Sequence, residues 1–141
     1  MAKPLDTPAR YRTIFVSDMH LGTRGCQAAL ILDFLRHNEA DTIYLVGDII
    51  DGWRLRASWY WPQAHNDVIQ KLLRKVRHGA RMVFVPGNHD EFARQFIGQS
   101  FGGIEIVRNA VHVADDRMMD VAANDPVDAA LPGFRGQLFL E

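Results

Sequence analysis

The sequence predicts an α/β protein built around a mostly parallel sheet. Three short apolar runs, at residues 13–16, 42–46 and 82–85, have the length and composition of buried strands. Between them lie two segments, residues 27–37 and 65–77, in which apolar side chains recur at helical spacing. Strands that alternate with helices in this way are typical of a parallel sheet covered by helices and joined through right-handed crossovers.

Each helical segment has one apolar face. These positions are Ala28, Ile31, Leu32 and Leu35 in the first segment and Val68, Ile69, Leu72, Leu73 and Val76 in the second. Gly79 follows the second segment where a helix commonly ends in a glycine cap. Both segments therefore predict amphipathic helices that pack on the sheet.

The remaining segments are less regular. Residues 1–12 hold two prolines and mixed charge, and we expect an extended lead-in before a folded unit at residues 13–114. Two further runs, at 104–107 and 111–113, predict strands that pair as a hairpin. His112 alternates with its two valine neighbours, so we expect its side chain to face solvent.

Composition narrows the class of protein. The chain has 141 residues, a length that predicts one soluble domain. Its formal net charge is −1, so we expect no nucleic-acid partner. The single cysteine, Cys26, suits a reducing compartment, and no apolar run is long enough to span a membrane. We expect a cytoplasmic protein. The second helix carries four basic residues, Lys71, Arg74, Lys75 and Arg77. We expect them to form a solvated face of the helix, and docking on the inner membrane is the alternative.

Polar side chains follow each of the three buried strands. The first run ends in Asp18 and His20, and the second ends in Asp48. The third leads to Asn88 and His89. Because the carboxyl ends of parallel strands share one edge of the sheet, these side chains are expected to converge there. Carboxylate, imidazole and amide ligands suit Mn, Fe, Zn or Mg, so the sequence predicts a metal site.

Three stretches, FVSDMHLG, YLVGDIIDGW and VFVPGNHDEF, resemble the N-terminal motifs of the calcineurin-like metallophosphoesterases. Within that family, GDIIDGWRL, WYWPQAHN and FGGIEIV resemble the UDP-2,3-diacylglucosamine diphosphatase group. The resemblance covers residues 11–114. It implies a β-sandwich flanked by helices, of which this chain holds the N-terminal βαβαβ part.

The resemblance also implies an activity. Two divalent metal ions, with manganese first and iron, zinc or magnesium as alternatives, would hydrolyse the pyrophosphate of UDP-2,3-diacylglucosamine in lipid A synthesis. Two other functions stay open. The chain could be another phosphodiesterase or a phosphoprotein phosphatase of the same superfamily, or a non-catalytic truncated remnant. The oligomeric state is not predicted.

Residue roles carry over from the matching motifs. Asp18 and His20 would ligate one metal, Asp48 would bridge both metals, and Asn88 would ligate the second. Asn88 and His89 would contact the substrate, and His89 would help protonate the leaving oxygen.

The residues beside these ligands have two interpretations each. Asp90 would be catalytic by orienting His89, or it would cap the helix that follows. Asp51 would support the ligands or serve as a turn residue, which we favour. Trp53 and Arg54 would contact the substrate at the mouth of the site, or pack a loop against a helix.

Residues 115–141 match no motif of the family. Family members supply further ligands from a His-Gly pair and a Gly-His-x-His stretch, whereas this sequence has no histidine after His112. We expect a truncation or frameshift near Asp116 that replaced the natural continuation. One face of the sheet would then be exposed, and metal binding would be weak.

Overall fold

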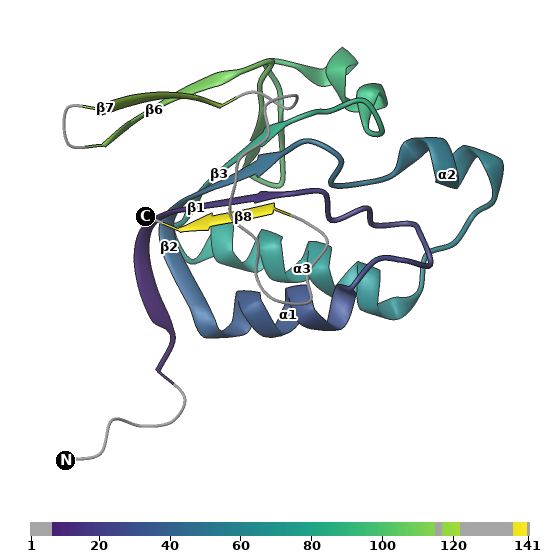
Figure 1. Ribbon diagram of the computed structural model, residues 1–141, viewed down its shortest axis with the longest axis horizontal. Helices are drawn as coiled ribbons and strands as arrows, with labels where there is room; N and C mark the ends of the chain where they lie inside the picture. Colours follow the sequence, from purple (N-terminus) through teal and green to yellow (C-terminus); the bar gives the residue numbers. More distant parts are fainter. Residues whose placement is uncertain (1–6, 115–116, 122–136, 141) are drawn as a thin grey trace.

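A six-stranded, mostly parallel sheet organises the chain, with strand order β4-β5-β3-β2-β1-β8 (Figure 1). The computed structural model describes residues 7–114, 117–121 and 137–140. The four parallel strands are β1 (Ala9–Ser17), β2 (Asn38–Val46), β3 (Arg81–Val85) and β5 (Ile104–Ile106). Two strands run antiparallel at the edges, β4 (Ser100–Phe101) against β5 and β8 (Gln137–Leu140) against β1. The predicted α/β class is confirmed.

Two amphipathic helices, α1 (Ala28–His37) and α3 (Gln63–Arg77), cover one face of this sheet (Figure 1). Their buried positions, among them Ile31, Leu35, Val68 and Leu72, join the main hydrophobic core with the inward side chains of the strands. A short helix, α2 (Gly52–Ala57), and a 3₁₀ helix, η1 (Glu91–Phe96), follow β2 and β3. The predicted helices are thus present at nearly the predicted bounds.

The central strands begin earlier than their apolar runs. β1 starts at Ala9, inside the predicted lead-in, and Ala9 pairs in register with Asn38 of β2. The first residues of both strands are mostly exposed or half-buried. Hydrophobicity marks only the buried part of each strand, so it did not reveal these polar ends.

A second, two-stranded sheet is formed by β6 (Ala110–Ala114) and β7 (Arg117–Val121). The predicted hairpin between residues 104–107 and 111–113 is therefore wrong. β5 instead continues the main sheet in parallel beside β3, with Met82 opposite Ile104. Ile104 and Ile106 are buried in the helix-covered core, and this burial favours the main sheet over a local hairpin.

The β6–β7 hairpin lies over the face of the sheet opposite the helices (Figure 1). Beneath it, Phe15, Tyr44 and Val85 form a second core that includes Val121 of β7. The expectation that this face would be exposed is therefore wrong, since Phe15 and Tyr44 are only 4% and 3% exposed.

His112 was predicted to face solvent, and this too is wrong. Its ring packs edge-on against Phe15 and Tyr44, at centroid distances of 5.3 and 5.6 Å, whereas Val111 and Val113 are exposed. The alternation along β6 was predicted correctly, but its two faces were assigned in reverse. A sequence cannot show which face of a strand meets the rest of the protein.

Lys75 does not belong to the solvated face of α3. Its buried ammonium donates to the Asn38 carbonyl at 2.9 Å and pairs with Glu39 at 3.2 Å. Burial lowers the pKa of Lys75, and Glu39 partly offsets that effect. In the described residues no helix is long and apolar enough to cross a membrane.

The tail predicted at residues 115–141 is described only at β7 and β8. Residues 115–116, 122–136 and 141 lie outside the described residues. The truncation or frameshift near Asp116, which is one of them, stays a prediction.

Candidate metal centre

Backbone hydrogen bonds tie together the three segments that leave the carboxyl ends of β1, β2 and β3. The amide of Asp18 donates to the carbonyl of Gly47 at 3.1 Å, and that of Gly47 donates to Val85 at 2.8 Å. The amide of Gly52 donates to the carbonyl of His89 at 2.8 Å. The polar residues predicted to converge are therefore held on one backbone framework at the edge of the sheet.

Three of the predicted metal ligands adopt backbone conformations that non-glycine residues rarely take. The φ angles are 56° at Asp18, 50° at His20 and 53° at Asp48. Described residues other than glycine show no further positive φ. Such left-handed residues cost about 1–3 kcal/mol each and concentrate at functional sites, where they re-aim side chains.

Asp18, His20 and Asp48 each offer a donor atom within 4.8 Å of the other two. Ser17 donates its hydroxyl to Asp18 at 2.7 Å, and the amide of His89 donates to the Asp48 carboxylate at 2.9 Å. Two carboxylates and an imidazole form a donor set that fits a divalent ion such as Mn, Fe, Zn or Mg. This juxtaposition supports the predicted metal position.

The electrostatics of the centre reflect crowding of opposite charges. The Asp18 carboxylate, 3.7 Å from Nε2 of His20, raises the pKa of His20 to about 9, and Asp51 adds to this effect while burial opposes it. The same contact with His20 lowers the pKa of Asp18. Without an ion, the imidazolium neutralises carboxylates that a cation would otherwise neutralise.

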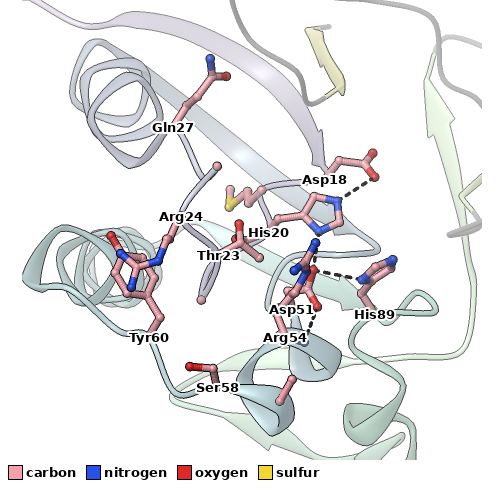
Figure 2. Close-up of a pocket in the computed structure, with 14 residues that line it drawn as sticks. Asp18, His20, Thr23, Arg24, Gln27, Asp51, Arg54, Ser58, Tyr60 and His89 are labelled. Carbon is pink, nitrogen blue, oxygen red and sulfur yellow. Dashed lines mark hydrogen bonds and ion pairs between the residues drawn. The ribbon is translucent and has the colours of Figure 1, made fainter.

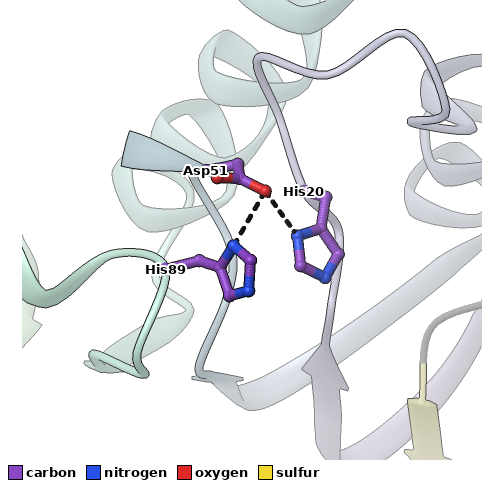
Figure 3. Close-up of side chains that lie close together, drawn as sticks. All are labelled: His20, Asp51 and His89. Atoms are coloured by element: carbon purple, nitrogen blue, oxygen red, sulfur yellow. Dashed lines mark hydrogen bonds and ion pairs between the residues drawn. The ribbon is translucent and has the colours of Figure 1, made fainter. Parts of the chain in front are cut away.

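Asp51 combines the two roles that the sequence left open, a turn residue and a support for the ligands. Its side chain is buried, and its Oδ2 lies 3.1 Å from Nδ1 of His20 and 3.0 Å from Nδ1 of His89 (Figure 3). Its other oxygen accepts the amide of Arg54 at 3.0 Å and so caps α2. The turn interpretation that we favoured describes only the cap. The signal that could have identified Asp51 is the second aspartate of GDIID, three residues after Asp48.

A carboxylate shared by two Nδ1 atoms determines the tautomer of both rings. Because a carboxylate accepts hydrogen bonds, His20 and His89 each carry a proton on Nδ1 toward Asp51. Nε2 of the neutral ring is then a free lone pair. Asp51, His20 and His89 also satisfy the distance limit for holding an ion, but the separations of 3.0 and 3.1 Å are those of hydrogen bonds.

His89 lies between two other rings. The His20 ring meets it edge-on at 5.1 Å, and the Trp53 ring packs on it at a centroid distance of 4.3 Å and a tilt of 34°. Trp53 comes from α2 and is 48% exposed. Asn88, next to His89, is exposed at the same sheet edge, and its role as a metal ligand stays a prediction.

Asp90 neither orients His89 nor caps the helix that follows, the two roles that were predicted for it. It is fully buried, and its carboxylate accepts the backbone amides of Asp48, Ile49 and Gly87. It makes no side-chain cap for η1, and Asp51 occupies the position on His89 that Asp90 was predicted to take. Burial raises the pKa of Asp90, against the lowering effect of those amides. Asp90 thus joins the second loop to the third and cannot reach a substrate.

A cavity of about 550 Å³ opens beside the centre (Figure 2). Asp18, His20, Asp51 and His89 line one part of it, and Arg54 of α2 lines it as well. A volume in the range of about 300–1,000 Å³ is typical of small-molecule sites. The metal donors therefore border a space that a substrate could enter.

Carboxylate and imidazole donors at the carboxyl edge of a parallel sheet form a candidate metal centre in an α/β fold. The chain belongs to the calcineurin-like phosphoesterase family, whose sequence profile matches residues 11–130. The match extends past residue 114, into the segment in which the sequence shows no motif of the family.

Two curated relatives are similar over part of their length. The UDP-2,3-diacylglucosamine hydrolase of Chromohalobacter salexigens is 35% identical over 86 residues, which are 55% of this chain and 32% of that protein. The protein of the same name from Nitrosococcus oceani is 32% identical over 94 residues, 64% of this chain and 36% of that protein. The chain spans about a third of the length of these relatives.

Proposed function

We propose that this chain carries the metal centre of a metal-dependent phosphoesterase. The observation that carries the proposal is the convergence of Asp18, His20 and Asp48 within 4.8 Å of one another, next to His89. Family membership and the names of both relatives support a hydrolase that acts on phosphoester bonds. Two divalent ions, manganese first and iron, zinc or magnesium as alternatives, would be held by Asp18, His20, Asp48 and Asn88.

Bound divalent ions supply an electrophile for a phosphoryl oxygen and a hydroxide at neutral pH. The side chains of the protein orient the substrate and supply the proton for the leaving group. Asp51 keeps the Nδ1 proton of His89 on its own side, so Nε2 of His89 is directed to the open side of the centre. There a protonated His89 contacts the phosphoryl group and donates its Nε2 proton to the leaving oxygen. Trp53 restrains the ring by packing on it.

For the substrate, we propose the pyrophosphate of UDP-2,3-diacylglucosamine, which the names of both relatives support. Asn88, His89, Trp53 and Arg54 would contact it, with the Arg54 guanidinium on a phosphate. This substrate belongs to lipid A synthesis, so we propose a cytoplasmic protein that associates peripherally with the inner membrane. Another phosphodiesterase or a protein phosphatase would use the same metal centre, with different residues around the substrate.

The test is manganese-dependent hydrolysis by the purified chain, with UDP-2,3-diacylglucosamine, an aryl phosphodiester, a cyclic nucleotide and a phosphopeptide as substrates. Asp48→Ala removes the proposed bridging carboxylate, and Asp41→Asn, at an exposed position of β2 remote from the centre, is the matched control. Hydrolysis that Asp48→Ala abolishes and Asp41→Asn retains would support the proposal, and the preferred substrate would identify the class. A chain that is folded by circular dichroism, binds Mn²⁺ and hydrolyses none of these substrates would instead be a non-catalytic remnant.

A further inference from the structure

The cavity beside the metal centre has more positive charge than its own carboxylates neutralise. Arg24 and Arg54 both line it, and in the described part of the chain neither guanidinium is paired with a carboxylate. The two carboxylates of the lining, Asp18 and Asp51, are already in contact with His20, at 3.7 and 3.1 Å. The two guanidinium groups are therefore available to an anion from outside.

Arg24 is exposed, and an aromatic ring supports its guanidinium group. Its guanidinium carbon lies 4.6 Å from the centroid of the Tyr60 ring, a distance typical of a cation–π contact. Tyr60 packs edge-on against buried His65 at 5.8 Å, and Nδ1 of His65 accepts the amide of Gly22 at 2.9 Å. One buried residue thus anchors both the loop that carries Arg24 and the ring that supports it.

The Arg24–Tyr60 pair and the metal donors lie on different sides of the same cavity. Figure 2 shows Arg24 and Tyr60 together, facing His20, Asp51 and His89 across the space, with Thr23 between the two groups. A single phosphoryl group at the metal donors would leave the Arg24 side of the cavity unfilled. A substrate with a second anionic group beyond the first would reach both.

We infer that Arg24, supported by Tyr60, forms a second anion subsite that binds the phosphoryl group next to the scissile one. The subsite gives the second phosphoryl group of the diphosphate proposed above a named protein partner. The inference rests on the proposed function, because that function places the scissile phosphoryl at the metal donors. Three observations define the subsite: the guanidinium of Arg24 has no carboxylate partner among the described residues, the Tyr60 ring supports it, and the cavity joins it to the centre.

The test is a binding measurement that does not require hydrolysis. Calorimetric titrations compare methylenediphosphonate, which carries two phosphoryl-like groups and is not hydrolysed, with methylphosphonate at the same free Mn²⁺ concentration. The variant is Arg24→Met, and the matched control is Arg56→Met, since Arg56 is exposed on α2 and does not line the cavity. Circular dichroism checks that both variants fold.

We expect the unsubstituted chain to bind the diphosphonate at least about 10-fold more tightly than the monophosphonate, since a charge-assisted contact is worth roughly that factor or more. Arg24→Met should reduce this preference to less than about 3-fold, and Arg56→Met should preserve it. A preference that survives Arg24→Met, or that both variants reduce equally, would overturn the subsite in favour of general electrostatic attraction.

The same variants separate this inference from the proposed function. If manganese-dependent hydrolysis of an aryl phosphodiester is present but the diphosphonate is not preferred, the subsite is wrong and the phosphoesterase proposal stands. If the diphosphonate preference depends on Arg24 but no substrate is hydrolysed, the subsite stands and the catalytic proposal fails.

Discussion

Replacing Asp51 by asparagine is the sharpest test of how the centre is organised. The carboxylate accepts from Nδ1 of both His20 and His89, at 3.1 and 3.0 Å, while its other oxygen caps α2. In Asp51→Asn the remaining oxygen can keep the cap, but an amide N–H replaces the acceptor shared by the two rings. His20 then favours the tautomer with its proton on Nε2, which removes the lone pair that a metal needs, and His89 loses the acceptor that orients its ring.

The expected loss can be estimated from these contacts. Removing one partner that orients a histidine ligand costs about 10–100-fold in metal affinity or activity, and here one carboxylate serves two rings. We therefore expect Asp51→Asn to lower turnover by at least about 100-fold. Because both histidines are half-exposed and can change tautomer, the free energy of unfolding should fall by only about 1–2 kcal/mol.

The assay combines Mn²⁺ titration by calorimetry, hydrolysis of an aryl phosphodiester, and ¹⁵N chemical shifts of the imidazoles, which report the tautomer. Asp41→Asn makes the same charge change at an exposed residue of β2 and should behave like the unsubstituted chain. If Asp51→Asn keeps both Mn²⁺ affinity and the Nδ1-protonated tautomers, the proposed role of Asp51 is refuted.

Three further predictions follow from other contacts. Gly87→Ala would place a Cβ 2.8 Å from Oδ1 of Asp48 and 3.0 Å from the amide nitrogen of Asp48. We therefore expect Gly87→Ala to destabilise the chain by about 1–3 kcal/mol in urea unfolding and to weaken Mn²⁺ binding. An unfolding curve like that of the unsubstituted chain would contradict this. Burial lowers the pKa of His65 below 6.5, so its contribution to stability is present above pH 6.5 and is lost as the pH falls. The stability advantage of the unsubstituted chain over His65→Asn should therefore shrink from pH 8 to pH 5, and a constant difference would show that His65 does not titrate in this way. Saturating Mn²⁺, at about 100 times its dissociation constant, should stabilise the chain by about 2.7 kcal/mol in thermal unfolding, and Asp48→Ala should remove most of that gain.

The strands, helices and strand-end residues could be read from the sequence because their signals are local. Alternating apolar runs and helical faces lie within short windows, and the carboxyl ends of parallel strands share an edge by geometry. The proximity of Asp18, His20 and Asp48 follows from that rule together with the motifs.

The pairing partners of the strands could not be predicted from such local signals. β6 could pair with β5 or with β7, and the difference lies in where Ile104 and Ile106 are buried. That choice is made by contacts with β3 and the helices, which no local window contains. The inward orientation of His112 depends in the same way on Phe15 and Tyr44 beneath it.

The sequence by itself determined the α/β class, the family and the residues that end each strand, because these depend on residue type and spacing along the chain. Only the tertiary structure decided how the neighbouring carboxylates are used. Asp51 and Asp90 are similar in sequence context, yet one orients two imidazoles and the other holds three backbone amides. The physical reason is that a carboxylate takes its role from the donors that folding brings within about 3 Å, and most of these donors lie in loops that follow other strands.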